Sequence, residues 1–124
     1  MANILLVDDD EAIRKMLRIL LTRMGHEVDE VANGSRAWAS FQARPADVVI
    51  MDLIMPEKEG LETISQFKRN GAKTKILAIS GGGRMDARDL LAIADQLGAD
   101  KILAKPFTSE ELVAALTILL PAKA

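Results

Sequence analysis

A chain of 124 residues has the length of one ordinary domain, and its 49% hydrophobic and 27% charged residues supply a sizeable core, which excludes collagen-like, coiled-coil and largely disordered classes. The net charge of −2 gives no basic surplus for nucleic acid or an anionic membrane, and the lack of cysteine excludes disulfides, thiolate catalysis and Cys-ligated zinc. No secretory signal and no run of ~18 hydrophobic residues is present. We therefore expect a cytoplasmic protein without membrane insertion or direct nucleic-acid binding.

Short hydrophobic runs alternate with segments of helical periodicity along the whole chain. The runs end at charged or turn-forming residues and predict strands at 4–7, 28–31, 47–52, 75–80 and 101–104. Most of these runs are hydrophobic throughout, which is typical of strands that are covered on both faces.

Helices are predicted between the strands, at 11–24, around 37–44, from about 60 to 70, and at 86–97 and 108–120. Asp10 is the expected N-cap of the first helix, and Thr108 with Glu111 predicts a capping box for the last. The alternation implies parallel pairing with right-handed crossovers. The predicted fold class is therefore α/β, a doubly wound five-stranded parallel sheet between two layers of helices.

Polar residues follow four of the predicted strands, at the ends where ligands bind in an open parallel sheet. In chain order these residues are Asp8, Asp9 and Asp10 after the first strand, Asp52 after the third, Ser80 after the fourth and Lys105 after the fifth. The second strand contributes no such residue. Each of them taken singly has an ordinary explanation as a helix cap, a turn residue or a solvated cation. Together they indicate one shared site.

Asp8, Asp9 and Asp52 would bring three carboxylates together, and like charges at short distance repel each other. A hard divalent cation relieves that repulsion, and oxygen ligands suit Mg²⁺, for which Mn²⁺ can substitute. A carboxylate, a hydroxyl and a lysine beside Mg²⁺ are the groups that phosphoryl transfer requires. The pattern therefore predicts Mg²⁺-assisted phosphoryl chemistry.

These residues resemble the receiver domain of two-component response regulators, the CheY-like group with flavodoxin-like topology. The resemblance extends from Ile4 to about Leu120 and implies a sheet order of 2-1-3-4-5. Its motifs are Asp8-Asp9 after a hydrophobic strand, Asp52-Leu53-Ile54-Met55-Pro56 with Gly60, Ser80, and Lys105-Pro106-Phe107.

The resemblance implies that Asp52 is the phosphoacceptor. It would take its phosphoryl group from a phosphohistidine of a sensor histidine kinase or a histidine phosphotransfer protein. Asp9 would ligate Mg²⁺ directly, Asp8 would act largely through metal-bound water, and Ile54 would add its backbone carbonyl.

The same resemblance implies how the domain would switch. Ser80 would donate a hydrogen bond to one phosphoryl oxygen, Lys105 would pair with another, and the bond before Pro106 would be cis. Receivers often carry Tyr or Phe where this chain has Ile102, and that ring moves inward when the hydroxyl residue moves. This chain therefore lacks the aromatic side chain of the switch. The glycines at 81–83 fit either a loop that the phosphoryl group orders or a plain connection.

The output face implied by the resemblance comprises the fourth helix, the fifth strand and the fifth helix, which would bind a downstream protein target. We expect residues 1–124 to form a single receiver domain, a monomer or weak dimer, without an output domain in this chain. The alternative is a fragment of a larger regulator. Such a domain accepts and slowly loses its own aspartyl phosphate and is not a turnover enzyme.

Two other functions compete with this interpretation. A pseudo-receiver would have the same fold but would bind partners without phosphorylation. Asp8-Asp9-Asp10 also superficially resembles the start of haloacid dehalogenase-like phosphatases, but Ala12 stands where that group has a hydroxyl or branched residue, and Met55-Pro56 is foreign to it. We therefore favour the phosphoacceptor.

Overall fold

The computed structural model describes residues 2–53, 59–80, 92, 95–96, 98–105 and 107–120. Within these ranges a single parallel sheet has the strand order β2-β1-β3-β4-β5. Its strands are β1 (Asn3–Val7), β2 (Glu27–Val31), β3 (Val48–Asp52), β4 (Lys75–Ser80) and β5 (Lys101–Ala104). The predicted fold class and strand order are therefore confirmed, with strand boundaries within one residue of the predicted ones.

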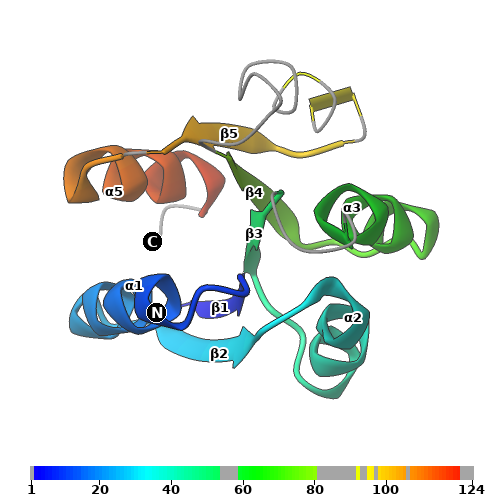
Figure 1. Ribbon diagram of the computed structural model, residues 1–124, viewed down its shortest axis with the longest axis horizontal. Coiled ribbons are helices and arrows are strands. Elements are labelled where there is room, and N and C mark those ends of the chain that lie inside the picture. Colours follow the sequence, from blue (N-terminus) through cyan, green and yellow to red (C-terminus); the bar gives the residue numbers. More distant parts are fainter. Residues whose placement is uncertain are drawn as a thin grey trace.

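Helices cover both faces of this sheet (Figure 1). Helices α1 (Glu11–Arg23) and α5 (Ser109–Leu119) lie on one face, and α2 (Gly34–Ala43) and α3 (Glu59–Arg69) lie on the other. The helix predicted at 86–97 falls largely outside the described residues, of which 92, 95 and 96 are helical. The glycines at 81–83 also lie outside them.

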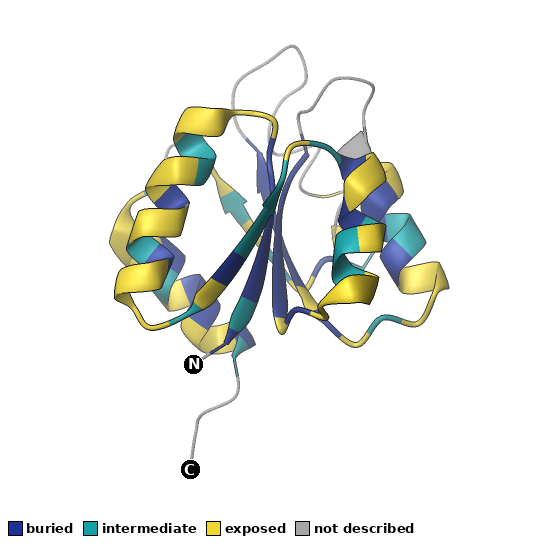
Figure 2. Cartoon of the chain, turned by 90° about the horizontal axis from the view of Figure 1, so that it is seen from below, coloured by how far each residue is buried: buried dark blue, intermediate teal, exposed yellow. Residues whose placement is uncertain are grey.

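The core consists of two layers separated by the sheet. Figure 2 shows the buried strands between helices whose outward faces are exposed. Because side chains alternate along a strand, Val49 and Met51 of β3 pack towards α2 and α3, whereas Val48 and Ile50 pack towards α1 and α5. The central strands are thus held from both sides, which gives the residues at their ends a rigid support.

Local capping sets where each helix begins beside the sheet. Asp10 accepts hydrogen bonds from the backbone N–H groups of Ala12 and Ile13 at 2.9 and 3.2 Å, which confirms it as the N-cap of α1. Thr108 and Glu111 form the predicted capping box of α5. The cap at Asp10 starts α1 directly after Asp8 and Asp9, which confines these two carboxylates to a short turn.

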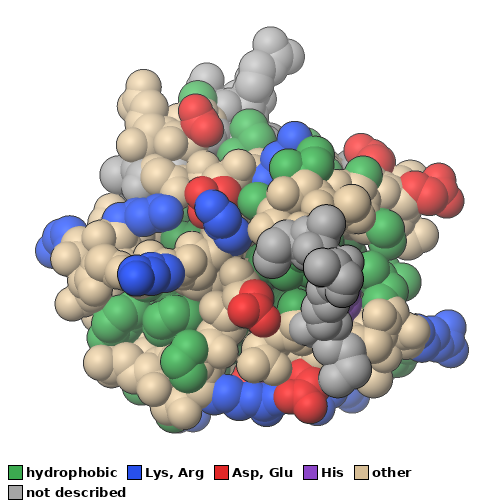
Figure 3. Space-filling model, turned by 180° about the vertical axis from the view of Figure 1, so that it is seen from behind, with side chains coloured by type: hydrophobic (Ala, Val, Ile, Leu, Met, Phe, Trp, Pro, Cys, Tyr) green, Lys and Arg blue, Asp and Glu red, His purple; other side chains and the backbone are tan. Residues whose placement is uncertain are grey.

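The surface carries both signs of charge. On the face seen in Figure 3, both Lys and Arg side chains and Asp and Glu side chains reach the surface. Among the described helices, none combines the length and the hydrophobicity that crossing a membrane would need.

Candidate metal centre at the carboxyl edge of the sheet

Three carboxylates converge where β1 and β3 end. Each of Asp8, Asp9 and Asp52 offers one oxygen, and these oxygens lie within 4.8 Å of one another. Asp8 follows β1 directly and Asp52 is the last residue of β3, and these adjacent strands pair with Val7 opposite Met51. The strand register therefore places Asp8 beside Asp52. The convergence expected from the sequence is confirmed.

The three acids differ in their exposure to solvent. Asp8 and Asp52 are buried, with 4% and 5% of their surface exposed, whereas Asp9 is exposed. Two carboxylates thus lie at the base of the cluster, and the third lies at its rim. Because Asp8 and Asp52 are largely removed from water, charge–charge interactions in the cluster are strong. The exposed Asp9 keeps the cluster accessible from solvent.

Lys105 supplies a positive charge to the same cluster. It follows β5, and its Nζ lies 3.6 Å from Asp8 Oδ2 and 3.5 Å from Asp52 Oδ2. Both distances exceed those of ordinary hydrogen bonds, so the ammonium is shared between two carboxylates as an ion pair. With all four groups ionised, the cluster has a formal charge of −2.

This donor set fits a divalent cation. Every metal-ligating atom that the cluster offers is a carboxylate oxygen, and the residual charge of −2 matches that of a dication. Hard oxygen ligands favour Mg²⁺ or Mn²⁺ over softer metals. The residues that would hold such an ion are Asp8, Asp9 and Asp52.

Ser80 is buried beside this cluster at the end of β4. Its exposed fraction is 0%, and its Oγ has no hydrogen-bond partner among the described residues. Its backbone carbonyl accepts a hydrogen bond from the N–H of Lys105 at 2.8 Å. A buried hydroxyl without a partner costs free energy, so its presence at a strand end next to charged groups is typical of a functional position.

Three predicted residues are not placed in the cluster. Ile102 lies on β5 opposite Ala78 of β4 and is 37% exposed. Ile54 and Pro106 fall outside the described residues. Their suggested contributions therefore stay predictions.

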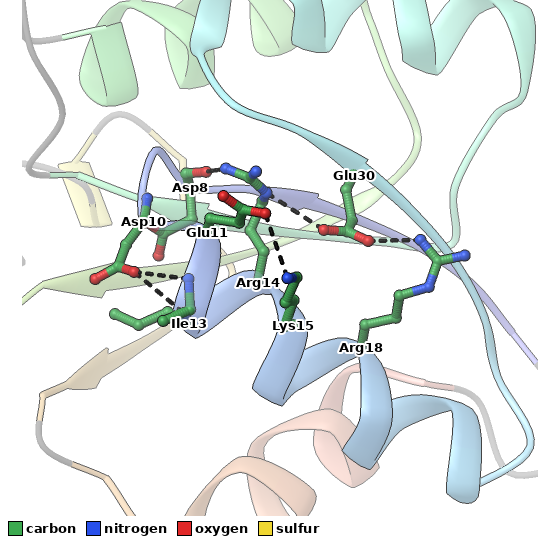
Figure 4. A network of polar contacts seen from close by, with 9 residues as sticks. Asp8, Asp10, Glu11, Ile13, Arg14, Lys15, Arg18 and Glu30 are labelled. Atoms are coloured by element: carbon green, nitrogen blue, oxygen red, sulfur yellow. Dashed lines mark hydrogen bonds and ion pairs between the residues drawn. The ribbon is translucent and has the colours of Figure 1, made fainter.

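A second network, which the sequence analysis missed, holds the turn that carries Asp8 and Asp9 (Figure 4). Arg14 of α1 donates from Nη1 to the backbone carbonyl of Asp8 at 2.6 Å, and its Nε contacts Glu30 Oε1 at 3.3 Å. Arg18 pairs with the other oxygen of Glu30 at 2.5 Å. Glu30 lies near the end of β2, so this strand takes part in the network, while the acidic cluster itself comprises Asp8, Asp9 and Asp52. Arg14 lies one helical turn after the cap Asp10, and this spacing indicates that its side chain can reach the turn before α1.

These arginines hold Glu30 in its charged form. The hydrogen bond from Arg18 is the largest influence on the pKa of Glu30, and together with that from Arg14 it outweighs burial and lowers the pKa below its ordinary value of 4.5. Glu30 is therefore a carboxylate at neutral pH, and its single negative charge is shared between the guanidinium groups of Arg14 and Arg18.

Residues 4–117 match the family described as "Response regulator receiver domain". The chain belongs to this family of receiver domains. It is 35% identical over 118 residues to the transcriptional regulatory protein QseB of Haemophilus influenzae, covering 95% of this chain and 52% of that protein. It is also 35% identical to the DNA-binding transcriptional regulator NtrC of Azospirillum brasilense over 116 residues, covering 93% of this chain and 23% of that protein. This receiver domain thus spans about half or less of these two relatives.

Solved structures agree with the assignment. The chemotaxis protein CheY4 of Vibrio cholerae superposes with a TM-score of 0.84 at 32% identity, over 97% of this chain and 99% of that one. The chain is therefore a receiver domain of two-component signalling with a flavodoxin-like fold, and its acidic pocket comprises Asp8, Asp9 and Asp52.

Proposed function

We propose that this receiver domain accepts a phosphoryl group on Asp52 from a phosphohistidine of a sensor histidine kinase or a histidine phosphotransfer protein, in a reaction that requires Mg²⁺. The observation that carries the proposal is the convergence of Asp8, Asp9 and Asp52 around one point, with Lys105 Nζ 3.5 Å from Asp52. Membership in the receiver family supports the same conclusion.

The proposed reaction is a transfer between two nucleophiles. A carboxylate oxygen of Asp52 forms a bond to phosphorus while the phosphorus–nitrogen bond to the donor imidazole breaks, and the imidazole leaves with the electron pair. The product is an acyl phosphate on Asp52. When bound, Mg²⁺ would neutralise charge on the phosphoryl oxygens, and Asp8 and Asp9 would hold it.

Lys105 and Ser80 are suited to stabilise the product. The ammonium of Lys105 is shared between Asp8 and Asp52 at distances beyond a hydrogen bond, so it can turn to a phosphoryl oxygen without losing a strong partner. Ser80 Oγ, which lacks a partner among the described residues, gains one by donating to a second oxygen.

Phosphorylation would switch the domain through charge. The acyl phosphate carries about −1.5 to −2 charges and three acceptor oxygens, in place of the single negative charge of the Asp52 carboxylate. Reversing a 1:99 equilibrium takes ~5.5 kcal/mol, whereas one neutral hydrogen bond from Ser80 contributes ~1 kcal/mol. Ser80 therefore acts together with Lys105 and the metal. The output face comprises the helix predicted at 86–97, β5 with Ile102, and α5, and it binds a downstream protein.

Intact mass spectrometry after incubation with Mg²⁺ and acetyl phosphate tests the proposal. We expect one added phosphoryl group, which is abolished by chelation and by Asp52→Asn. Asp10→Asn is the matched control, because asparagine caps a helix as well as aspartate does and the acceptor is untouched. No adduct with any donor, together with partner binding that Asp52→Asn leaves unchanged, would favour the pseudo-receiver. Rapid turnover dependent on Asp8 would favour a phosphatase.

A further inference from the structure

We propose that Arg14 is a positioning residue for the metal site. Its guanidinium holds the peptide between Asp8 and Asp9 in the orientation that directs both side chains to the ion. This inference rests on the proposed function, since it concerns the Mg²⁺ that the phosphoryl transfer requires. It concerns residues on α1 and β2 that touch neither the ion nor the phosphoryl group.

The argument begins where the chain leaves the sheet. The backbone N–H of Asp8 still donates to Val31 of β2 at 3.3 Å, which continues the β1–β2 ladder by one step. The carbonyl of the same residue instead accepts from Arg14 Nη1 of α1 at 2.6 Å. Arg14 thus fixes the first peptide group that lies beyond the strand.

That peptide group is shared with Asp9. A peptide unit is planar, so a fixed carbonyl at Asp8 also fixes the direction of the N–H and Cα of Asp9. On the other side, Asp8 Oδ1 accepts from the N–H of Asp10 at 2.8 Å, which fixes the carboxylate of Asp8. Figure 4 shows Asp8, Asp10 and Arg14 gathered at the start of α1. The guanidinium is thus the contact by which α1 holds the Asp8–Asp9 peptide.

Glu30 makes this arrangement compatible with a cation nearby. Arg14 is largely removed from water, with 15% of its side chain exposed, and an unbalanced guanidinium there would repel a divalent ion. The carboxylate of Glu30, which also pairs with Arg18, contacts Arg14 Nε at 3.3 Å and offsets part of that charge. Glu30 also directly precedes Val31, which accepts from Asp8. Two consecutive residues of β2 therefore take part in holding Asp8. Val31 accepts from its N–H, and Glu30 orients the arginine that donates to its carbonyl.

Arginine suits this position better than lysine. The planar guanidinium donates to the Asp8 carbonyl from one nitrogen and to Glu30 from another, so its orientation is determined by two partners. A lysine ammonium offers a point charge on a flexible chain. It is expected to reach one partner at a time.

Calorimetric titration of the full chain with Mg²⁺ alone, without a phosphodonor, tests the inference. We expect Arg14→Met to raise the Kd for Mg²⁺ by about tenfold, the scale found for residues that orient metal ligands, and Arg14→Lys to give a smaller increase. Arg18→Met is the matched control. Arg18 lies on the same helix and contacts the same Glu30 but makes no contact with Asp8 that the structure shows, so its Kd should stay within about twofold of wild type.

A second measurement separates positioning from folding. The rate of phosphorylation by acetyl phosphate is followed against Mg²⁺ concentration, and Arg14→Met should raise the half-saturating Mg²⁺ while the rate at saturation stays near that of wild type. If Arg14→Met and Arg14→Lys bind Mg²⁺ like wild type and only unfold more easily, Arg14 is structural and the inference is wrong. If wild type itself does not bind Mg²⁺, the proposed function fails, and this inference fails with it.

Discussion

Lys105 donates its backbone N–H to the carbonyl oxygen of Ser80 at 2.8 Å, so the two residues that close β4 and β5 are joined through their main chains. The register of these strands, with Ser80 opposite Ala104, leads directly to this contact. A displacement of the Ser80 backbone therefore pulls on the residue whose ammonium contacts Asp52. Under the proposed function, this link would let the hydroxyl and the ammonium respond together to a phosphoryl group.

Removing the Ser80 hydroxyl should not destabilise the unphosphorylated protein. Because Oγ is buried without a partner among the described residues, Ser80→Ala is expected to leave the free energy of unfolding unchanged or to raise it by up to ~1 kcal/mol. Thr74→Val is the control, since the hydroxyl of Thr74 donates to the carbonyl of Lys75. This substitution should lower the free energy of unfolding by ~1 kcal/mol. Urea unfolding measures both. A loss of several kcal/mol in Ser80→Ala would contradict this description of the site.

Neutralising Lys105 should strengthen the binding of Mg²⁺. Its ammonium lies within 3.6 Å of two of the three carboxylates, so it competes with the cation for their charge. We expect Lys105→Met to lower the Kd for Mg²⁺ by about threefold to tenfold in a calorimetric titration at low salt. Lys101→Met, at the opposite end of β5, should leave the Kd unchanged. Weaker Mg²⁺ binding in Lys105→Met would show that the lysine instead assembles the site.

The stability that Glu30 contributes should depend on pH in one direction. Its pKa is lowered in the folded protein, chiefly by the hydrogen bond from Arg18, so its contribution is fully present above the ordinary value of 4.5. The contribution is lost as the pH falls through the lower pKa of the folded state. Urea unfolding of wild type and Glu30→Gln should therefore differ most near neutral pH and converge under acid conditions. A difference that is constant over this range would refute the assigned charge state.

Two glycines with positive φ should differ in their tolerance of alanine. Gly98 has φ +111°, and an added Cβ would lie 2.9 Å from Lys68 Cε, whose side chain pairs with Asp100. Gly71 has φ +69° with open space around it. Gly71→Ala should lower the free energy of unfolding by ~1 kcal/mol. Gly98→Ala should lower it by more, because φ +111° lies outside the left-handed region that other residues visit. Equal costs in thermal unfolding would contradict this ordering.

Much of the fold was predictable because its signals are local. The hydrophobic run from Lys75 to Ser80 predicted β4 with its correct bounds, and the spacing of Thr108 and Glu111 predicted the cap of α5. Strand ends meet at one edge of any parallel sheet, so the convergence of Asp8 with Asp52 followed from the order of elements.

The rest of the site depends on contacts between distant segments. Arg14 and Glu30 are separated by most of α1, a turn and most of β2, and no short pattern joins them. The difference between buried Asp8 and exposed Asp9 follows from which way the chain turns after β1. The lack of a partner for Ser80 Oγ among the described residues also depends on packing that a linear pattern does not contain.

Locating the phosphoryl group tests the central claim most directly. After incubation with Mg²⁺ and acetyl phosphate, the acyl phosphate is trapped by chemical reduction, and the modified residue is identified by peptide mass spectrometry. Since the carboxylate of Asp52 lies beside Asp8, Asp9 and Lys105, we predict modification at Asp52 alone. Modification at Asp8, as a phosphatase of the dehalogenase type would show, or no modification with Mg²⁺ present, would contradict the account.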